Sequence, residues 1–271
     1  MTTEAAQDSV FFPSGTQILG KDIKANALIG VAGRGGAGKS HLIRQLLTDP
    51  DYGPGEVGIL MAEDATPTYR VEGAHIKRFT GLSELDRAID EIKLACNDGL
   101  RMPKVWAVDS LSGTMDYQRR YYQKNPMVSE RTGGRDKREE YGEMGYMGID
   151  SLIDLRDSID SDVLILVTTF EKPGQLPEFA VSGQLVPKNF VRLMNVALHL
   201  RSEMGNYDPT QEVKPHPWRT ISKHGIYIDR FFFTQDSGEF LGKGHHNLDI
   251  KEPAYLPDIL RKIHDEKPLY L

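Results

Sequence analysis

The sequence predicts an α/β fold with a mostly parallel β-sheet that helices cover on both faces. Short runs that are apolar at every position predict strands buried on both sides, because a strand with one solvent face would alternate. These runs alternate along the chain with segments of helical periodicity, which is typical of a parallel sheet with crossover helices. Two later strand-like segments flank Lys223-His224-Gly225 and predict a C-terminal antiparallel hairpin at the sheet edge.

The predicted elements follow one another in a regular order. Buried strands are expected at residues 27–32, 57–62, 105–108, 163–167 and 196–200. Helices are expected at residues 41–47, 83–97 and 146–159, where apolar residues recur at helical spacing. The hairpin strands fall at residues 218–222 and 226–234, and a short terminal helix falls at residues 257–264.

Length and composition favour one large domain. The chain has 271 residues, within the range of a single α/β domain. We expect an N-terminal arm at residues 1–26, a core at residues 27–247 and a C-terminal tail with a short helix at residues 248–271. No apolar run approaches the ~18 residues that span a bilayer, and the N-terminus lacks a signal-peptide pattern. We therefore expect a cytoplasmic protein that does not contact membranes.

Charge and cysteine content narrow the function classes. Cys96 is the only cysteine, which excludes an intramolecular disulfide and a cysteine-based zinc site. The net charge is −6, so nucleic-acid binding would need a local basic patch.

The clearest motif is GRGGAGKS at residues 33–40, which matches G-x-x-x-x-G-K-[ST] at every fixed position. It lies between a predicted strand and a predicted helix, as a phosphate-binding loop requires. Glycines let backbone N–H groups turn toward phosphate oxygens, and the helix N-terminus adds positive potential. Lys39 is expected to reach the β- and γ-phosphates of ATP, and Ser40 to ligate Mg²⁺. The expected nucleotide-binding residues are Gly33, Arg34, Gly35, Gly36, Ala37, Gly38, Lys39, Ser40 and His41.

Polar residues at other strand ends complete the predicted site. Asp109 ends a buried strand and suits a carboxylate on the Mg²⁺ side, although a strand-end Asp can also simply start a turn. Glu63 is expected to be the general base that activates water, with Asp64 as the fallback and a helix cap as the alternative. Thr168 and Thr169 follow another strand and are candidates for sensing the γ-phosphate.

Residues 117–138, YQRRYYQKNPMVSERTGGRDKR, contain seven basic and two acidic residues, a local net charge of +5. Tyrosines are interleaved with the cations. Cations that follow a phosphate backbone and rings that stack on bases suit single-stranded nucleic acid. A solvated loop or an oligomer contact are the alternatives. The candidate DNA contacts are Arg119, Arg120, Tyr121, Tyr122, Lys124, Arg131, Arg135, Lys137 and Arg138.

Over about residues 25–245 the chain resembles the RecA-like ATPases, and among them the compact phage-encoded RecA-like nucleotide-binding proteins. The resemblance rests on the residue 33–40 motif, the strand end with Glu63, VDSLSG at residues 108–113, EYGEMG at residues 140–145, and VLILVTT followed by a loop with Ser182-Gly183. It implies a RecA-like core with Mg²⁺-dependent ATP hydrolysis, single-stranded DNA binding and annealing in phage recombination. It also implies that residues 117–138 form the first DNA-contacting loop.

The resemblance further implies a ring or filament with ATP between subunits and a cation supplied by the neighbouring subunit. The family's Lys-x-Arg pair matches best at residues 242–245, where Lys243 is kept and His245 replaces the arginine. Arg230 and Lys223 are competing candidates for that cation. A single-strand-binding protein is a further candidate partner.

A second family loop corresponds to residues 171–190, where Phe179 and Phe190 are candidates either for wedging between bases or for core packing.

Two other functions remain open. One is a DNA-translocating motor, either a helicase or a packaging ATPase. The other is a nucleotide-gated assembly or regulatory protein with little turnover. The replacement of the family's arginine by His245 is consistent with this alternative.

Overall fold

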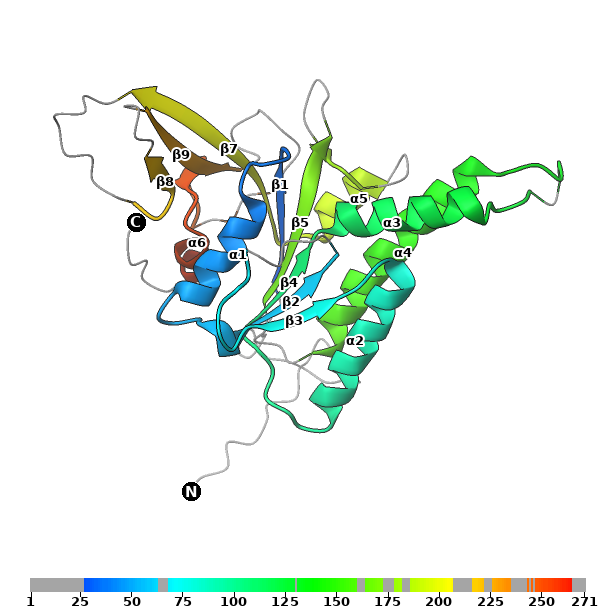
Figure 1. Ribbon diagram of the computed structural model, residues 1–271, viewed down its shortest axis with the longest axis horizontal. Helices are drawn as coiled ribbons and strands as arrows, with labels where there is room; N and C mark the ends of the chain where they lie inside the picture. The colour runs from blue at the N-terminus through cyan, green and yellow to red at the C-terminus, as the bar shows by residue number, and fades with distance from the viewer. Residues whose placement is uncertain are drawn as a thin grey trace, which may run out of the picture.

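The computed structural model describes residues 27–62, 68–129, 131–159, 164–172, 178–181, 186–206, 216–221, 226–234, 243, 245 and 247–264. In these residues, ten strands form one mixed sheet in the order β10-β9-β7-β1-β5-β4-β2-β3, with β6 paired to β5 and β8 paired to β9 (Figure 1). The predicted α/β fold with a mostly parallel sheet is therefore confirmed. The predicted N-terminal arm, residues 1–26, lies outside the described residues.

The parallel part of the sheet carries the buried strands. Its members are β7 (Val196–Asn206), β1 (Leu28–Gly33), β5 (Leu164–Lys172), β4 (Val105–Asp109), β2 (Val57–Met61) and β3 (His75–Arg78). The central strand β1 is parallel to both β5 and β7, with Gly33 level with Phe170 on one side and Leu200 on the other. Strand β4 lies between β5 and β2. Because these strands are parallel, the carboxyl ends of β1, β5 and β4 meet at one edge of the sheet.

The antiparallel strands extend the other side of the sheet. They are β9 (Ile226–Phe233), β8 (Arg219–Ile221) and β10 (Lys251–Pro253), while the two-residue β6 (Glu178–Phe179) pairs with β5. Strand β9 pairs with β7 along its whole length and with β8 near its start. The predicted antiparallel hairpin is confirmed, and its turn, residues 222–225, lies outside the described part of the chain.

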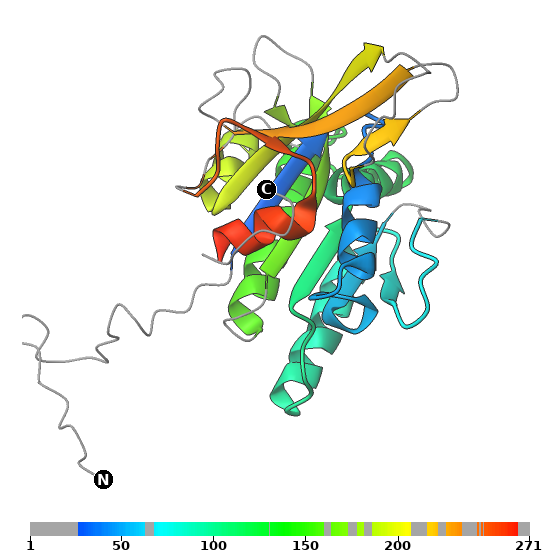
Figure 2. The same ribbon diagram turned by 90° about the vertical axis from the view of Figure 1, so that its left-hand side faces the viewer.

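Helices cover both faces of the sheet. One face carries α1 (Lys39–Thr48) and α6 (Leu256–Ile263), which lie side by side (Figure 2). The opposite face carries α2 (Leu82–Asn97), α3 (Leu111–Lys124), α4 (Lys137–Ser158) and α5 (Val186–Leu193). A short 3-10 helix, η2 (Pro54–Glu56), precedes β2. None of the helices in the described ranges is long and apolar enough to cross a lipid bilayer.

The predicted C-terminal tail shares the core in its described part. Leu256, Ile259 and Leu260 of α6 are fully buried in the same cluster as α1. Arg261 forms ion pairs with Asp49 and Asp258 in the same layer. Residues 251–263 therefore pack as part of the domain rather than apart from it.

Several predicted boundaries were wrong. Helix α4 begins at Lys137 rather than at residue 146, because Asp136 caps it by accepting hydrogen bonds from the backbone N–H groups of Arg138 (3.0 Å) and Glu139 (3.1 Å). Strands β5 and β7 continue to Lys172 and Asn206. Six elements were not predicted from the sequence: η2, β3, α3, β6, α5 and β10.

We expected residues 117–138 to form a loop, but they comprise the second half of α3, a twelve-residue turn at 125–136 and the start of α4. Side by side, α3 and α4 run beyond the sheet to this turn (Figure 1). We call residues 117–143 the α3–α4 arm. The two helices approach closely at Gly148, where an added Cβ would lie 2.8 Å from the Met115 side chain. The arm is therefore anchored in the core and projects from it.

Candidate nucleotide site and basic arm

The phosphate-binding motif lies between β1 and α1, as predicted. Strand β1 ends at Gly33 and α1 begins at Lys39. Between them, Gly36 and Gly38 have φ values of 75° and 101°, in the left-handed region that favours glycine. The Ala37 N–H donates to the Arg34 carbonyl at 3.1 Å and closes the turn. The loop conformation thus accounts for two glycines of the motif.

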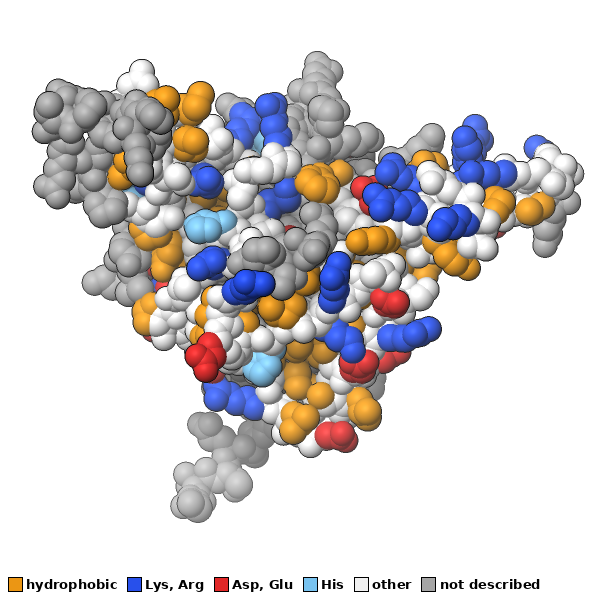
Figure 3. Space-filling model, viewed as in Figure 1, with side chains coloured by type: hydrophobic (Ala, Val, Ile, Leu, Met, Phe, Trp, Pro, Cys, Tyr) orange, Lys and Arg blue, Asp and Glu red, His pale blue; other side chains and the backbone are white. Residues whose placement is uncertain are grey.

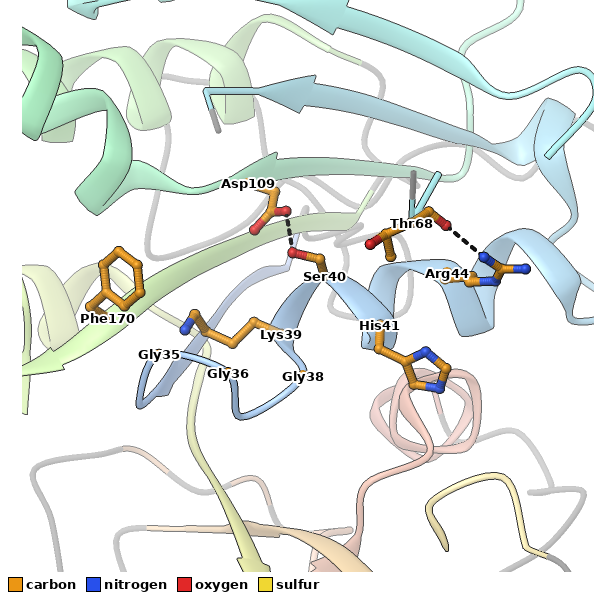
Figure 4. Close-up of a pocket in the computed structure, with 10 residues that line it drawn as sticks. All are labelled: Gly35, Gly36, Gly38, Lys39, Ser40, His41, Arg44, Thr68, Asp109 and Phe170. Atoms are coloured by element: carbon orange, nitrogen blue, oxygen red, sulfur yellow. Dashed lines mark hydrogen bonds between the residues drawn. The ribbon is translucent and has the colours of Figure 1, made fainter. Parts of the chain in front are cut away.

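A cavity of about 770 Å³ opens in front of this loop. It brings most of the predicted P-loop residues together with Asp109 from β4 and with side chains that no motif marked (Figure 4). Its lining residues are Gly35, Gly36, Gly38, Lys39, Ser40, His41, Arg44, Thr68, Asp109 and Phe170.

Asp109 is buried at the bottom of the site and accepts hydrogen bonds from three hydroxyl groups. The Ser40 hydroxyl donates to Oδ2 at 2.8 Å, and the Tyr69 hydroxyl donates to the same oxygen. The Thr168 hydroxyl donates to Oδ1 at 2.5 Å. Ser40 and Asp109 therefore meet as the sequence predicted, whereas Tyr69 was missed because it follows no motif.

The pair of Ser40 and Asp109 fits a Mg²⁺ ion. Mg²⁺ prefers oxygen ligands and is held by one or two protein groups together with phosphates and water. In the described ranges there is no group of three or more His, Cys, Asp or Glu residues that suits a metal. A hydroxyl and one carboxylate at the mouth of a phosphate loop match that sparse pattern.

Lys39 folds back onto its own loop. The ammonium group donates to the carbonyls of Gly33 (2.9 Å) and Arg34 (3.1 Å), and the residue is 7% exposed. It also lies 4.4 Å from the centre of the Phe170 ring, toward which Figure 4 shows it extending. Phe170 was not predicted, although it follows the Thr168-Thr169 pair directly.

Phe170 also connects the site to α3. Its N–H donates to the Ser112 hydroxyl at 2.7 Å. Ser110 caps α3 by accepting from the Gly113 N–H at 3.1 Å, immediately after Asp109. The helix that leads into the α3–α4 arm therefore starts at the candidate metal site.

His41 and Arg44 lie at the other end of the cavity. Figure 4 shows His41 directed away from Asp109, while Arg44 Nη1 donates to the Thr68 carbonyl at 3.1 Å. Burial, and then the positive charges of Arg230 and Arg44, lower the pKa of His41 below its ordinary value of 6.5. His41 is therefore mostly neutral at pH 7.

The remaining acid and hydroxyl predictions have mixed outcomes. Glu63 and Asp64 lie outside the described residues. The N–H of Ala62 donates to the Asp109 carbonyl at 2.8 Å, so the strand end before Glu63 lies beside Asp109. Thr168 faces Asp109, whereas Thr169 is buried on the opposite face of β5, since successive strand residues alternate. Only Thr168 reaches the site through its side chain.

The candidates for the cation from a neighbouring subunit lie in different places. Lys243 is exposed, its Nζ donates to the Met194 carbonyl at 2.8 Å, and its backbone pairs with Ala197. It does not line the cavity of its own chain, and its role toward a neighbour stays a prediction. Arg230 instead donates to the Ala37 carbonyl within its own P-loop at 3.1 Å. Lys223 lies outside the described part.

The basic side chains gather over the α3–α4 arm (Figure 3). Eight of the nine predicted DNA contacts are exposed: Arg119, Arg120, Tyr121, Lys124, Arg131, Arg135, Lys137 and Arg138. The ninth, Tyr122, is buried, and its hydroxyl donates to Glu143 at 2.7 Å. Burial and then the Glu143 carboxylate raise the pKa of Tyr122 to about 12. The prediction that Tyr122 stacks on a base was wrong, because its ring packs inside the arm.

Arg135 stabilises the tip of the arm. Its Nε and Nη2 donate to both carboxylate oxygens of Glu140, at 2.8 Å for the shortest contacts. Glu140 also accepts from the Met127 N–H at 3.2 Å. The Arg135 guanidinium thus joins the two sides of the turn, which a purely nucleic-acid role would not require.

The second predicted loop is only partly described. Phe179 and Phe190 are fully buried and meet edge to face, with ring centres 5.5 Å apart. They are core residues, so the idea that they wedge between bases was wrong. Ser182 and Gly183 lie outside the described residues.

No protein-family model matches the chain, and no curated protein is significantly similar to it. Its functional assignment therefore depends on the motif and the site geometry.

Proposed function

We propose that this chain is a RecA-like, Mg²⁺-dependent ATPase that binds single-stranded DNA through the α3–α4 arm and promotes annealing or recombination in phage DNA metabolism. The observation that carries the proposal is the GRGGAGKS loop between β1 and α1, with the Ser40 hydroxyl 2.8 Å from Asp109. A loop of this sequence with an acid at the end of another strand of the same sheet is the arrangement that holds a nucleoside triphosphate and its metal.

The proposed chemistry assigns a task to each residue. Backbone N–H groups of the loop and the N-terminal end of α1 hold the phosphates. Lys39 leaves the carbonyls of Gly33 and Arg34 and pairs with the β- and γ-phosphates. Ser40 and Asp109 hold Mg²⁺, which when bound offsets charge on the phosphate oxygens. Glu63 orients the attacking water.

The sheet order supports a RecA-like core. Strand β5 lies between β1, which leads into the P-loop, and β4, which ends in Asp109. The phosphate loop and the acid therefore lie at the same edge of one parallel sheet, which fits a nucleotide site there. Strand β9 adds the antiparallel edge that the predicted hairpin implied, and β10, which was not predicted, extends that edge.

The shape and charge of the α3–α4 arm support single-strand binding. Exposed cations suit a phosphate backbone, and the exposed ring of Tyr121 suits base stacking. The net charge of the whole chain is −6, so the local positive charge of residues 117–138 stands out against it. Because α3 starts next to Asp109, nucleotide binding and arm position are directly connected.

Calorimetric titration with Mg²⁺-ADP tests the nucleotide site. We expect the native chain to bind and Lys39→Ala to bind at least ~10-fold more weakly, because a charge-assisted contact to phosphate is lost. Lys77→Ala is the matched control, since Lys77 is an exposed lysine on β3 that pairs with Glu91 of α2. Equal affinities of all three proteins would contradict the proposal.

Fluorescence anisotropy with a labelled oligothymidylate tests the arm. Replacing Arg119, Arg120 and Lys124 by alanine is expected to weaken binding at least ~10-fold at low salt and to reduce the salt slope by roughly 0.7 per phosphate contact. A control replaces three exposed cations elsewhere, Lys77, Arg78 and Arg87. If the control loses as much affinity as the arm variant, the arm is not the DNA surface.

A nucleotide-gated assembly protein is the second candidate function. It is favoured by His245, which replaces the arginine of the family's Lys-x-Arg pair at residues 243–245. Tight Mg²⁺-ATP binding without turnover, in the presence of single-stranded DNA, would favour this alternative. Directional strand displacement on a forked duplex would instead indicate a translocating motor.

A further inference from the structure

Arg230 of β9 joins the antiparallel part of the sheet to the P-loop of its own chain. Its Nε donates to the Ala37 carbonyl at 3.1 Å, and its Nη1 donates to the Thr220 hydroxyl on β8 at 2.8 Å. A Cβ added at Gly38 would lie 3.1 Å from the same Nε. The guanidinium therefore lies directly against the backbone of the phosphate loop.

The contact fixes the orientation of one peptide group. The Ala37 carbonyl and the Gly38 N–H belong to the same planar trans peptide, so they point in opposite directions. Arg230 holds the carbonyl on one side, which directs the Gly38 N–H to the other side. Gly38 lines the nucleotide cavity, and the Ala37 N–H is already used by the Arg34 carbonyl. The Gly38 N–H is thus directed away from Arg230 in a residue that lines the cavity.

The backbone of Arg230 is held on both sides. Its N–H donates to the Trp218 carbonyl at 3.1 Å, and its carbonyl accepts from the Ala254 N–H at 2.9 Å. On the neighbouring Asp229, the two carboxylate oxygens accept hydrogen bonds from Nε and Nη2 of Arg219, each at 2.6 Å. Strand β9 is therefore a rigid base from which the Arg230 side chain reaches the loop.

We propose that Arg230 is a positioning residue that orients the Gly38 N–H toward the α- and β-phosphates of the nucleotide. The inference rests on the proposed nucleotide-binding function. The role proposed for Arg230 differs in two ways from that of a cation donated by a neighbouring subunit. Arg230 acts within its own chain, and it acts on phosphates that ADP and ATP share. Removing the Arg230 side chain should therefore weaken the binding of ADP and of ATP by the same factor.

The test measures the affinities of Mg²⁺-ADP and Mg²⁺-ATP by displacement of a fluorescent nucleotide. Arg230→Ala is expected to weaken both by the same factor, ~10-fold, since a hydrogen bond from a charged donor is lost. Arg230→Lys is expected to recover part of the loss, because an ammonium group can reach one carbonyl but lacks the fork that also binds Thr220. Arg219→Ala is the control, because it disturbs β8 and β9 without touching the P-loop.

Three results would overturn the inference. One is a loss restricted to ATP, which would indicate a contact with the γ-phosphate. Another is an equal loss in Arg219→Ala, which would indicate general loosening of the strands. The third is unchanged affinity in Arg230→Ala while Lys39→Ala abolishes binding. If the native chain shows no Lys39-dependent binding at all, the proposed function itself fails. Circular dichroism of the unliganded Arg230→Ala variant checks its folding, and if this variant does not fold, the equal ADP and ATP losses are measured in Arg230→Lys.

Discussion

The Ser40 hydroxyl lies 2.8 Å from Asp109 Oδ2, although 69 residues separate them in the sequence. The two side chains meet because β1 and β4 end at the same edge of the sheet with only β5 between them. Thr168 from β5 and Tyr69 from the segment after β2 donate to the same carboxylate. Three other segments thus converge on Asp109, which fixes its position before any metal binds.

We predict that Asp109→Asn weakens Mg²⁺ activation of ATP hydrolysis by ~10–100-fold. The amide keeps the size of the side chain but removes the negative charge and one acceptor oxygen. Tyr69→Phe is the control, because it removes one donor and leaves the carboxylate and Ser40 in place. Titrating the hydrolysis rate with Mg²⁺ measures the effect. A Mg²⁺ requirement unchanged in Asp109→Asn would remove Asp109 from the metal site.

Adjacent tyrosines on the arm are predicted to behave differently. Tyr121→Ala should weaken single-stranded DNA binding by ~1–3 kcal/mol without destabilising the fold, since Tyr121 is exposed. Tyr122→Phe should leave DNA affinity unchanged but lower stability by ~0.5–1.5 kcal/mol, because its hydrogen bond to Glu143 is lost. Anisotropy and urea unfolding measure the two effects. If Tyr122→Phe weakened DNA binding and Tyr121→Ala did not, the arm would have to rearrange when DNA binds.

Nucleotide affinity is predicted to rise as the pH falls from about 7.5 to about 5.5. The pKa of His41 is lowered in the free protein by burial and by Arg230 and Arg44, so its imidazole is mostly neutral at pH 7. A bound diphosphate favours the imidazolium and raises that pKa, so binding takes up a proton. Calorimetry with ADP should show this proton uptake, and His41→Asn should remove the part of it that His41 contributes. An identical pH profile in the variant would contradict the role of His41.

The C-terminal helix is predicted to depend on a buried ion cluster. Arg261 is 2% exposed and pairs with Asp49, Asp51 and Asp258. Burial alone would lower the pKa of Arg261, but the three carboxylates raise it above its ordinary value. Arg261→Met should therefore cost ~3–5 kcal/mol, because buried carboxylates lose their partner.

An exposed pair provides the comparison for this cluster. Lys251 and Glu203 form an ion pair at the surface. Lys251→Met should cost at most ~1 kcal/mol. Chemical denaturation of both variants tests the difference, and similar losses would show that the buried cluster is not what holds α6.

The local features of the site were predictable from the sequence. The motif of residues 33–40 specifies its own flanking strand and helix, so Lys39 and Ser40 were placed correctly. Asp109 was predictable because a buried strand ends there. The contacts of Tyr69, Phe170 and Arg230 were not, because they arise from the order of strands in the sheet, which no local pattern encodes.

The arm shows where the interpretation of charge went wrong. The density of cations in residues 117–138 favoured a loop, yet Leu111, Met115, Gln118 and Tyr122 recur at helical spacing and are all buried. That spacing was available in the sequence. The early start of α4 was harder to predict, because its first turns project beyond the core and carry few apolar residues. Tyr122 was assigned to DNA from its neighbours alone, although it lies on the buried side of α3.

The most direct test is the rate of ATP hydrolysis with and without single-stranded DNA at low salt, for the native chain and for Lys39→Ala. We predict hydrolysis that DNA stimulates in the native chain and that Lys39→Ala abolishes. A native rate that Lys39→Ala does not change would contradict the account, because the P-loop would then have no part in turnover.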